Sequence, residues 1–326
     1  METRTGVTHS PSRRDVIAAG AALLTGTVAD VRLEAARSGD RKLKVSVFSK
    51  HLQFLTVDQL PAAVAQMGFD GIDLTVRKGG HVEPERVEQD LAPAVSAIRN
   101  HGLEIPMVTT DIVDAQTPQA EAVIRTISKL GIKKYRWGGF LYVNEIPIAK
   151  QLEAFKPRVA KLAALNAQAG VCAMYHTHSG VGLVGAPIWD LHEILRESDP
   201  NSVSVNYDVG HATIEGGLGG WIDSFRITGK YLQGVAVKDF LWEKSAKGNW
   251  DAQWTPLGRG MVRFPRFFEM LAGTDFGGPL QLHFEYPLGG ADAGKREISI
   301  NQSEVYTAMK RDLAQLRGYL NAAGLA

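Results

Sequence analysis

Short apolar runs rich in β-branched residues alternate along the chain with longer stretches in which apolar positions recur every three or four residues. The first pattern predicts strands and the second predicts amphipathic helices. The expected strands cover residues 43–49, 71–76, 104–109, 132–137, 171–175, 203–207, 234–238 and 280–285. The expected helices cover residues 57–67, 84–100, 118–130, 147–169, 188–197 and 264–271, and a last one carries Val305, Met309, Leu313, Leu316 and Leu320.

Eight strand-then-helix units in succession predict an α/β protein with a (β/α)8 TIM barrel fold. The alternative at the level of fold is an open nucleotide-binding sheet. That fold needs a glycine-rich turn after its first strand, whereas the first strand here is followed by Ser49-Lys50-His51-Leu52-Gln53. The barrel is therefore the better interpretation.

The N-terminal segment has a different character from the rest of the chain. A twin-arginine pattern, an apolar stretch and a run of small residues follow one another, with the arginines at Arg13 and Arg14 and the small residues at 27–29. This order predicts a twin-arginine signal peptide over residues 1–29, a polar linker over 30–42 and the barrel over 43–326, with a periplasmic location. The alternative is a chance arginine pair before a frayed helix.

Composition narrows the class of partner. The chain has 326 residues, 44% of them hydrophobic, and a formal net charge of +1. It has no basic stripe that could follow a phosphate backbone, which argues against nucleic acid as a partner. The apolar stretch near the N-terminus is too short to span a bilayer, so we expect no membrane span in the mature protein. The single cysteine, Cys172, excludes an intramolecular disulfide and a thiolate metal site.

Polar groups follow the last four predicted strands, at the point where each strand ends. In a barrel of parallel strands the chemistry lies at that end. The groups are Tyr175-His176-Thr177-His178, then Asn206-Tyr207-Asp208-Val209-Gly210-His211, then Val237-Lys238-Asp239, then His283-Phe284-Glu285-Tyr286. Because strand side chains alternate, His176 shares a face with His178, and His283 shares one with Glu285.

Imidazole and carboxylate ligands together suit Mn, Zn, Fe or Co better than Mg or Ca. A metal beside a sugar carbonyl would polarise it, a carboxylate or histidine would move the neighbouring proton, and Lys238 could hold the oxygen that becomes negative. Structural roles stay open: one histidine of the pair 176/178 in the core, Asp208 and His211 as caps, and Lys238 with Asp239 as an ion pair. The barrel position of Lys134 and Arg136 is also left open.

The longest connection between predicted elements covers residues 240–262 and has no obvious secondary structure. It contains Trp242, Trp250 and Trp254. Tryptophan faces suit the apolar C–H faces of sugars, and packing of the loop is the alternative role for these rings. Long loops of this kind are often functional.

These motifs resemble the xylose-isomerase-like barrel superfamily of sugar isomerases and epimerases, from residue 43 to the C-terminus. The matching points are Tyr-His-x-His at 175–178, Tyr-Asp-x-Gly-His at 207–211, Val-x-Val-Lys-Asp at 235–239, Pro-Leu-Gly-Arg-Gly at 256–260 and His-x-Glu at 283–285. The resemblance implies one divalent metal, with Asp208 and Glu285 as the family's aspartate and last glutamate. It also implies substrate contacts by His211 and Arg259.

The chain departs from the family pattern at two ligand positions. His176 stands where many members have glutamate, and Ala236 stands where many have histidine. One of His176, His178 and His283 would have to supply the missing ligand. These departures put the usual 3-epimerase mechanism in doubt, since it relies on two opposed glutamates.

We therefore expect an enzyme of the sugar isomerase or epimerase type that moves a proton next to a carbonyl, with one divalent metal (Mn, Zn, Fe or Co). The alternatives are a lyase or hydrolase with the same α-proton chemistry and a non-catalytic sugar-binding barrel. The expected partner is a small sugar or glycoside, and oligomerisation is left open. The expected catalytic residues are Glu285, His178 and Lys238, the substrate-binding residues His211, Arg259, His51 and Trp242, and the metal ligands His176, Asp208, Glu285 and His283.

Overall fold

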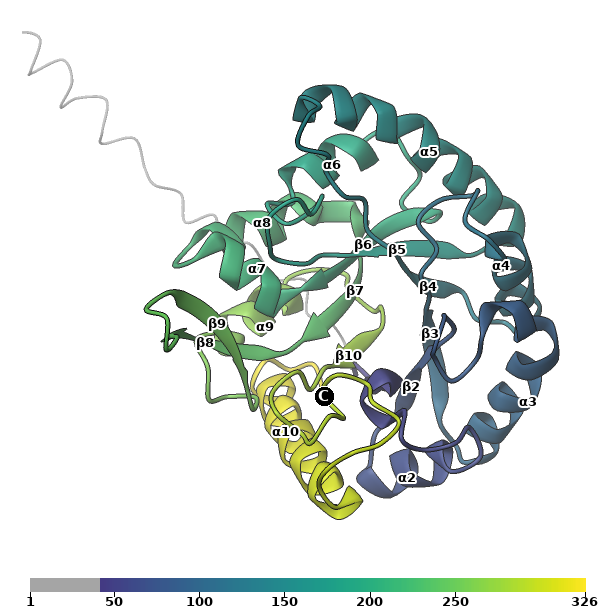
Figure 1. Cartoon of the computed structure of the whole chain (residues 1–326), viewed down its shortest axis with the longest axis vertical. Coiled ribbons are helices and arrows are strands. Elements are labelled where there is room, and N and C mark those ends of the chain that lie inside the picture. Colours follow the sequence, from purple (N-terminus) through teal and green to yellow (C-terminus); the bar gives the residue numbers. More distant parts are fainter. Residues whose placement is uncertain (1–41) are drawn as a thin grey trace, which may run out of the picture. The chain divides into compact units, whose positions relative to one another are not determined.

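Eight parallel strands close into a barrel in the computed structural model, which describes residues 42–326 (Figure 1). β1 pairs with both β2 and β10, which closes the ring. The (β/α)8 prediction is thus confirmed. In order around the barrel the strands are β1 (Val45–Phe48), β10 (Leu280–Leu282), β7 (Leu232–Val237), β6 (Val203–Asp208), β5 (Cys172–His176), β4 (Lys134–Trp137), β3 (Glu104–Thr109) and β2 (Gly71–Thr75).

Helices surround the strands, as Figure 1 shows. They are α2 (Leu60–Met67), α3 (Val87–Asn100), α4 (Ala120–Lys129), α5 (Ile148–Ala169), α6 (Trp189–Leu195), α7 (Val209–Gly216), α8 (Gly220–Thr228), α9 (Phe264–Ala272) and α10 (Gln302–Ala322), with 3-10 turns at Ser49–Leu52, Pro84–Arg86 and Gly229–Tyr231. The helices α7 and α8 were not predicted. They are short and joined by glycines, so neither holds enough turns to show a clear helical period.

The core has two parts, because the side chains of each strand point alternately outward to the helices and inward to the barrel interior. Tyr207 points outward, where its hydroxyl donates to the Trp221 carbonyl at 2.9 Å and lies 2.7 Å from the Ser224 hydroxyl, both in α8. Inward-facing Met107, Cys172 and Met174 form a separate buried cluster inside the barrel. Since Met174 and His176 share one face of β5, the same alternation carries His176 to the barrel interior above this cluster.

The connection after β7 differs from its prediction. Instead of an irregular loop, residues 240–262 contain most of an antiparallel hairpin of β8 (Asp239–Lys244) and β9 (Trp250–Thr255). Most side chains of the hairpin are exposed or half-buried. Without a buried face, its strands show no apolar alternation, which is the signal that predicts a strand.

Two N-terminal predictions, the twin-arginine signal and the linker, lie outside the described residues except for the last position of the linker. Within residues 42–326, no helix combines the length and the apolar character needed to span a bilayer.

Candidate active site

The predicted site residues gather at the carboxyl end of the barrel. His176 and Asp208 are the last residues of β5 and β6, Lys238 follows β7 directly, and His283 and Glu285 lie just beyond β10. The barrel brings these strand ends to one rim, so residues far apart in sequence become neighbours. We call this rim the barrel mouth.

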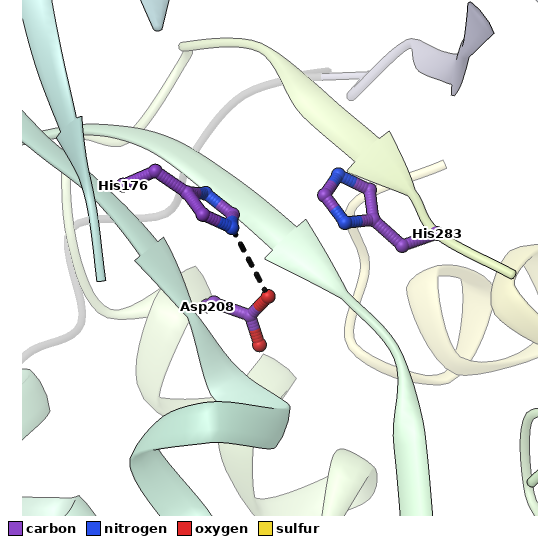
Figure 2. A group of neighbouring side chains, drawn as sticks. All are labelled: His176, Asp208 and His283. Atoms are coloured by element: carbon purple, nitrogen blue, oxygen red, sulfur yellow. Dashed lines mark ion pairs between the residues drawn. The ribbon is translucent and has the colours of Figure 1, made fainter. Parts of the chain in front are cut away.

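Three of these residues form a compact buried group: His176, Asp208 and His283 (Figure 2). Each offers a nitrogen or carboxylate oxygen, and these atoms all lie within 4.8 Å of one another. His176 Nε2 is 3.5 Å from Asp208 Oδ2, the contact drawn in Figure 2. Asp208 is fully buried and the two histidines nearly so.

The group contains buried polar atoms that form no hydrogen bond. Among the described residues, Asp208 Oδ2 and both ring nitrogens of His283 are in this position. Buried polar atoms without a partner are costly, and in native structures they call for an explanation such as an ion. The donor set of two imidazoles and one carboxylate suits a divalent transition metal or zinc. The residues therefore fit the metal that the resemblance implies.

Both imidazoles of the group are neutral at physiological pH. Burial, followed by the positive charge of Arg136, holds the pKa of His176 well below its usual value. Burial and then Lys238 lower the pKa of His283 in the same direction. A neutral imidazole keeps a lone pair for a metal.

Asn206 orients His176. Its side-chain nitrogen lies 3.0 Å from His176 Nδ1 and 2.8 Å from Gln281 Oε1, while its Oδ1 has no partner among the described residues. In this arrangement Nδ1 accepts, so Nε2 carries the proton. A free Nε2 lone pair would require the Asn206 amide to turn over, so that Oδ1 accepts from Nδ1, and the Gln281 amide to turn with it, because Gln281 Oε1 now accepts from Asn206 at 2.8 Å. Outer contacts of this kind fix the tautomer of a ligating histidine.

Asp208 has two roles in the structure. Its Oδ1 accepts a hydrogen bond from the His211 amide at 2.9 Å and caps the N-terminus of α7. Its Oδ2 faces His176 and Lys238. The cap that we considered as an alternative to a ligand therefore uses only Oδ1, and Oδ2 lies 3.3 Å from Lys238 Nζ on the side of the metal-binding group.

Lys238 lies at the centre of the charged groups. Its Nζ is 3.3 Å from Asp208 Oδ2, 3.6 Å from Glu285 Oε1 and 2.7 Å from His211 Nε2. It also lies 4.3 Å from the ring centre of Trp254, a cation–π contact. The predicted alternative of an ion pair with Asp239 is wrong. Asp239 instead accepts from the amides of Phe240, Gly258, Gly260 and Val262.

Glu285 lies beside the metal-binding group and is not one of its three members. Its Oε1 is 3.6 Å from both Lys50 Nζ and Lys238 Nζ and 4.0 Å from His283 Nδ1. Burial alone would raise the pKa of Glu285, but the charges of Lys238 and Lys50 outweigh it and bring the pKa to about 2. Glu285 is thus a carboxylate at neutral pH, and its side chain is 24% exposed.

His178 lies at the mouth, and both of its ring nitrogens form hydrogen bonds. Arg136 Nη2 donates to His178 Nε2 at 3.3 Å, so Nδ1 carries the proton and donates to the His176 carbonyl at 3.1 Å. Burial, then Arg136 and Lys238, lower the pKa of His178 to about 3. The sequence did not decide the barrel position of Arg136, and the structure places it at the mouth. Lys134 lies two residues earlier on the same face and binds Gln233 near the start of β7.

The four predicted substrate contacts have different settings. His211 lies in the mouth between Lys238 and Ser179 Oγ, which is 2.7 Å from its Nδ1. Arg259 is exposed. His51 is fully buried, and backbone groups of Ala291 and Phe284 occupy both of its ring nitrogens. These contacts favour a structural role for His51.

Among the tryptophans of the hairpin, Trp254 rather than the predicted Trp242 lies against the site. Its ring meets His211 edge-on at 5.0 Å as well as Lys238. Trp242 packs edge-on against Phe240 and is 38% exposed. Sequence reasoning named Trp254 only as one of three rings. If β9 had been recognised as a strand, its two-residue alternation would have indicated which of its side chains share a face with Trp254.

The comparisons place the chain in a family. A family model described as "Xylose isomerase-like TIM barrel" matches residues 61–302, so the chain belongs to that family. None of the curated proteins matches it significantly.

Solved structures share the fold at low sequence identity. A D-tagatose 3-epimerase-like protein has a TM-score of 0.65 at 14% identity, covering 86% of this chain and 98% of its own. The IolI protein with a bound zinc atom has a TM-score of 0.65 at 13% identity and the same coverage. The probable 3-DHS dehydratase AsbF from Bacillus anthracis has a TM-score of 0.60 at 17% identity, with 84% and 99% covered. At these identities the likeness is one of fold.

Proposed function

We propose that this protein is a metal-assisted enzyme of the sugar isomerase or epimerase type, which removes a proton next to a substrate carbonyl. The observation that carries the proposal is the buried group of His176, Asp208 and His283, whose ligand atoms lie within 4.8 Å of one another, with both His283 nitrogens without a hydrogen bond among the described residues, next to Lys238 and Glu285. The family and the zinc bound in the IolI structure support it.

His176, Asp208 and His283 would hold the metal. In this proposal His283 supplies the imidazole that Ala236 lacks. Ala236 is in register with Gln281 on β10, and His283 lies two residues further along that strand direction on the same face. When bound, a divalent metal would act as a Lewis acid on the substrate carbonyl and make the adjacent proton easier to remove.

Glu285 is the residue that we propose takes the proton. It is ionised, partly exposed and at the mouth. Lys238 is the proposed donor to the oxygen that gains negative charge. A substrate oxygen that draws the Lys238 ammonium away from Glu285 would raise the pKa of the carboxylate and make it a stronger base. Trp254 and His211 hold the lysine on its other sides.

One observation favours a lyase as the second candidate. His176 takes the place of a carboxylate on β5, so Glu285 has no opposed glutamate there to return a proton to the other face of the carbon. Isomerisation and elimination each need one base, whereas the usual 3-epimerase mechanism needs two. The probable dehydratase among the structural neighbours is consistent with elimination.

Solvent exchange of the α-proton tests this proposal for either reaction. Candidate keto-sugars and glycosides are incubated in D2O with the protein, and loss of the α-proton signal is followed by NMR. We expect exchange with wild type and a drop of at least a hundredfold with Glu285→Gln. Arg226→Gln, at an exposed position of α8, is the control and should exchange at the wild-type rate. Exchange by Glu285→Gln at the wild-type rate would rule out the role of Glu285.

A further inference from the structure

Two arginines form a second feature of the barrel mouth, apart from the metal-binding group. Arg136 is on β4, and Arg77 follows β2 by two residues. Their guanidinium carbons lie 5.8 Å and 5.6 Å from the centre of the same ring, Phe48. The same ring also packs against His283, at 4.7 Å between ring centres, and against His51, at 5.5 Å. The two arginines and His283 of the metal-binding group therefore lie around one ring.

These arginines are poorly paired compared with others in the protein. Within residues 42–326, Arg136 has no carboxylate oxygen within 4.0 Å, and the only one that near to Arg77 is Asp111 Oδ1 at 3.9 Å. By contrast, Arg86 holds Asp90 through two hydrogen bonds of 2.6 and 2.7 Å, and Arg158 holds Asp114 through two of 2.8 and 2.6 Å. A partly buried guanidinium without such a partner is unfavourable unless a ligand supplies one.

Two further carboxylates near the arginines, Glu285 and Asp73, bind other groups. Glu285 is engaged by Lys50 and Lys238. Asp73 is buried below the mouth, its two oxygens accepting from the Thr109 hydroxyl at 2.9 Å, and burial raises its pKa to about 7. Burial and then the charge of Arg77 lower the pKa of Arg136, as expected for like charges close together. Although the whole chain has a net charge of only +1, this side of the mouth carries local positive charge.

We propose that the substrate carries an anionic group, a carboxylate or a phosphate, which binds between Arg136 and Arg77 across the Phe48 ring. The inference rests on the proposed function, since it concerns the substrate of the same site. A guanidinium presents a planar fork of donors that matches the oxygens of either group. Anchored there, the far end of a sugar acid or sugar phosphate would extend past Phe48 toward His283 and Glu285.

Calorimetric binding without turnover tests the inference. The probes are D-glucuronate, D-galacturonate, glucose 6-phosphate and galactose 6-phosphate, each compared with its neutral parent, glucose or galactose. We expect at least one anionic probe to bind about tenfold or more tighter than its parent, because a charge-assisted hydrogen bond is lost in the neutral sugar. Tighter binding of the uronates or of the phosphates identifies which anionic group the site prefers.

Substitutions locate the binding site. In Arg136→Gln and Arg77→Gln the preference for the anion should fall by about tenfold, while Arg226→Gln, which removes one positive charge from α8, should keep it. Thermal unfolding and metal content of each variant show whether the fold and the metal-binding group are intact. Equal affinity for every anionic probe and its parent would overturn the inference, as would a preference that survives in both variants. Anion binding without any α-proton exchange would instead count against the proposed function alone.

Discussion

The histidines at the barrel mouth differ in whether hydrogen-bond partners occupy their ring nitrogens. An ammonium can only donate, so Lys238 makes Nε2 of His211 an acceptor, and Nδ1 then donates to Ser179. His51 has backbone partners on both nitrogens. His283 has none on either nitrogen within the described part of the chain. Of these three, His283 is the residue whose surroundings are best explained by a metal.

Asp73 gives a prediction about pH at the scale of a single residue. Because its folded pKa of about 7 is above its unfolded value near 3.8, the folded state binds the proton more tightly. Its contribution to stability is present at low pH and is lost as pH rises from about 4 to 7. Asp73→Asn has no such proton to lose. Relative to wild type, the variant should therefore gain roughly 2–3 kcal/mol of unfolding free energy between pH 5 and pH 8.

Urea unfolding of both proteins at several pH values in this range measures the difference. When the unfolding free energy of one protein is subtracted from that of the other at each pH, the contributions of the other titrating groups cancel. A difference that stays constant from pH 5 to pH 8 would mean that Asp73 ionises normally in the folded protein.

At the scale of elements, one carboxylate closes the base of the β8–β9 hairpin. Asp239 begins the hairpin and accepts hydrogen bonds from amides at Gly258, Gly260 and Val262 on the returning chain. The hairpin in turn places Trp254 against Lys238 and His211. The Gly-Arg-Gly motif thus has a structural reason, because a Cβ at position 260 would meet Asp239 Oδ1 at 2.1 Å.

Gly260→Ala should therefore be destabilising and should loosen the hairpin. We expect a loss of about 2–3 kcal/mol, from steric overlap and weakened hydrogen bonds to a charged acceptor. Gly220→Ala, where a Cβ meets nothing within 4 Å, is the matched control and should change stability little. Denaturant unfolding and limited proteolysis of the 244–262 segment measure the effect. Equal stability of the two variants would show that Asp239 does not anchor the hairpin through Gly260.

The residue pattern of each element also decides how well the sequence predicts that element. The parallel strands β3 and β6 were predicted to within a residue, because β-branched and other apolar residues recur through both short runs. The hairpin and α7 lack a long apolar period and were missed. For the site, strand ends identified His176, Asp208 and His283. Hydrogen-bond partners such as Asn206 depend on register between strands, which one sequence does not specify.

At the scale of the whole molecule, the strand order of the barrel creates the site. β10 pairs with β7, β7 with β6 and β6 with β5, and this brings His283 just beyond the last strand near His176 and Asp208 of β5 and β6. The group therefore comes from one contiguous half of the barrel, the four strands at the C-terminal end of the chain. Export through a twin-arginine signal stays a prediction, since Arg13 and Arg14 lie outside residues 42–326.

The metal content of the purified protein tests the central claim most directly. Elemental analysis is made on wild type, His283→Ala and Asp208→Asn, after incubation with Mn, Zn, Fe or Co and removal of the excess. The Asn side chain in Asp208→Asn can still cap α7 through its own oxygen. A loss of metal in this variant would therefore reflect the lost carboxylate ligand and not a lost helix cap. His101→Ala, which removes an exposed imidazole at the end of α3, is the control.

We predict close to one metal per chain in wild type and in His101→Ala, and at least tenfold weaker retention in the two site variants. No metal in wild type with any of the four ions, or full retention in both His283→Ala and Asp208→Asn, would contradict the metal site on which the proposed function rests.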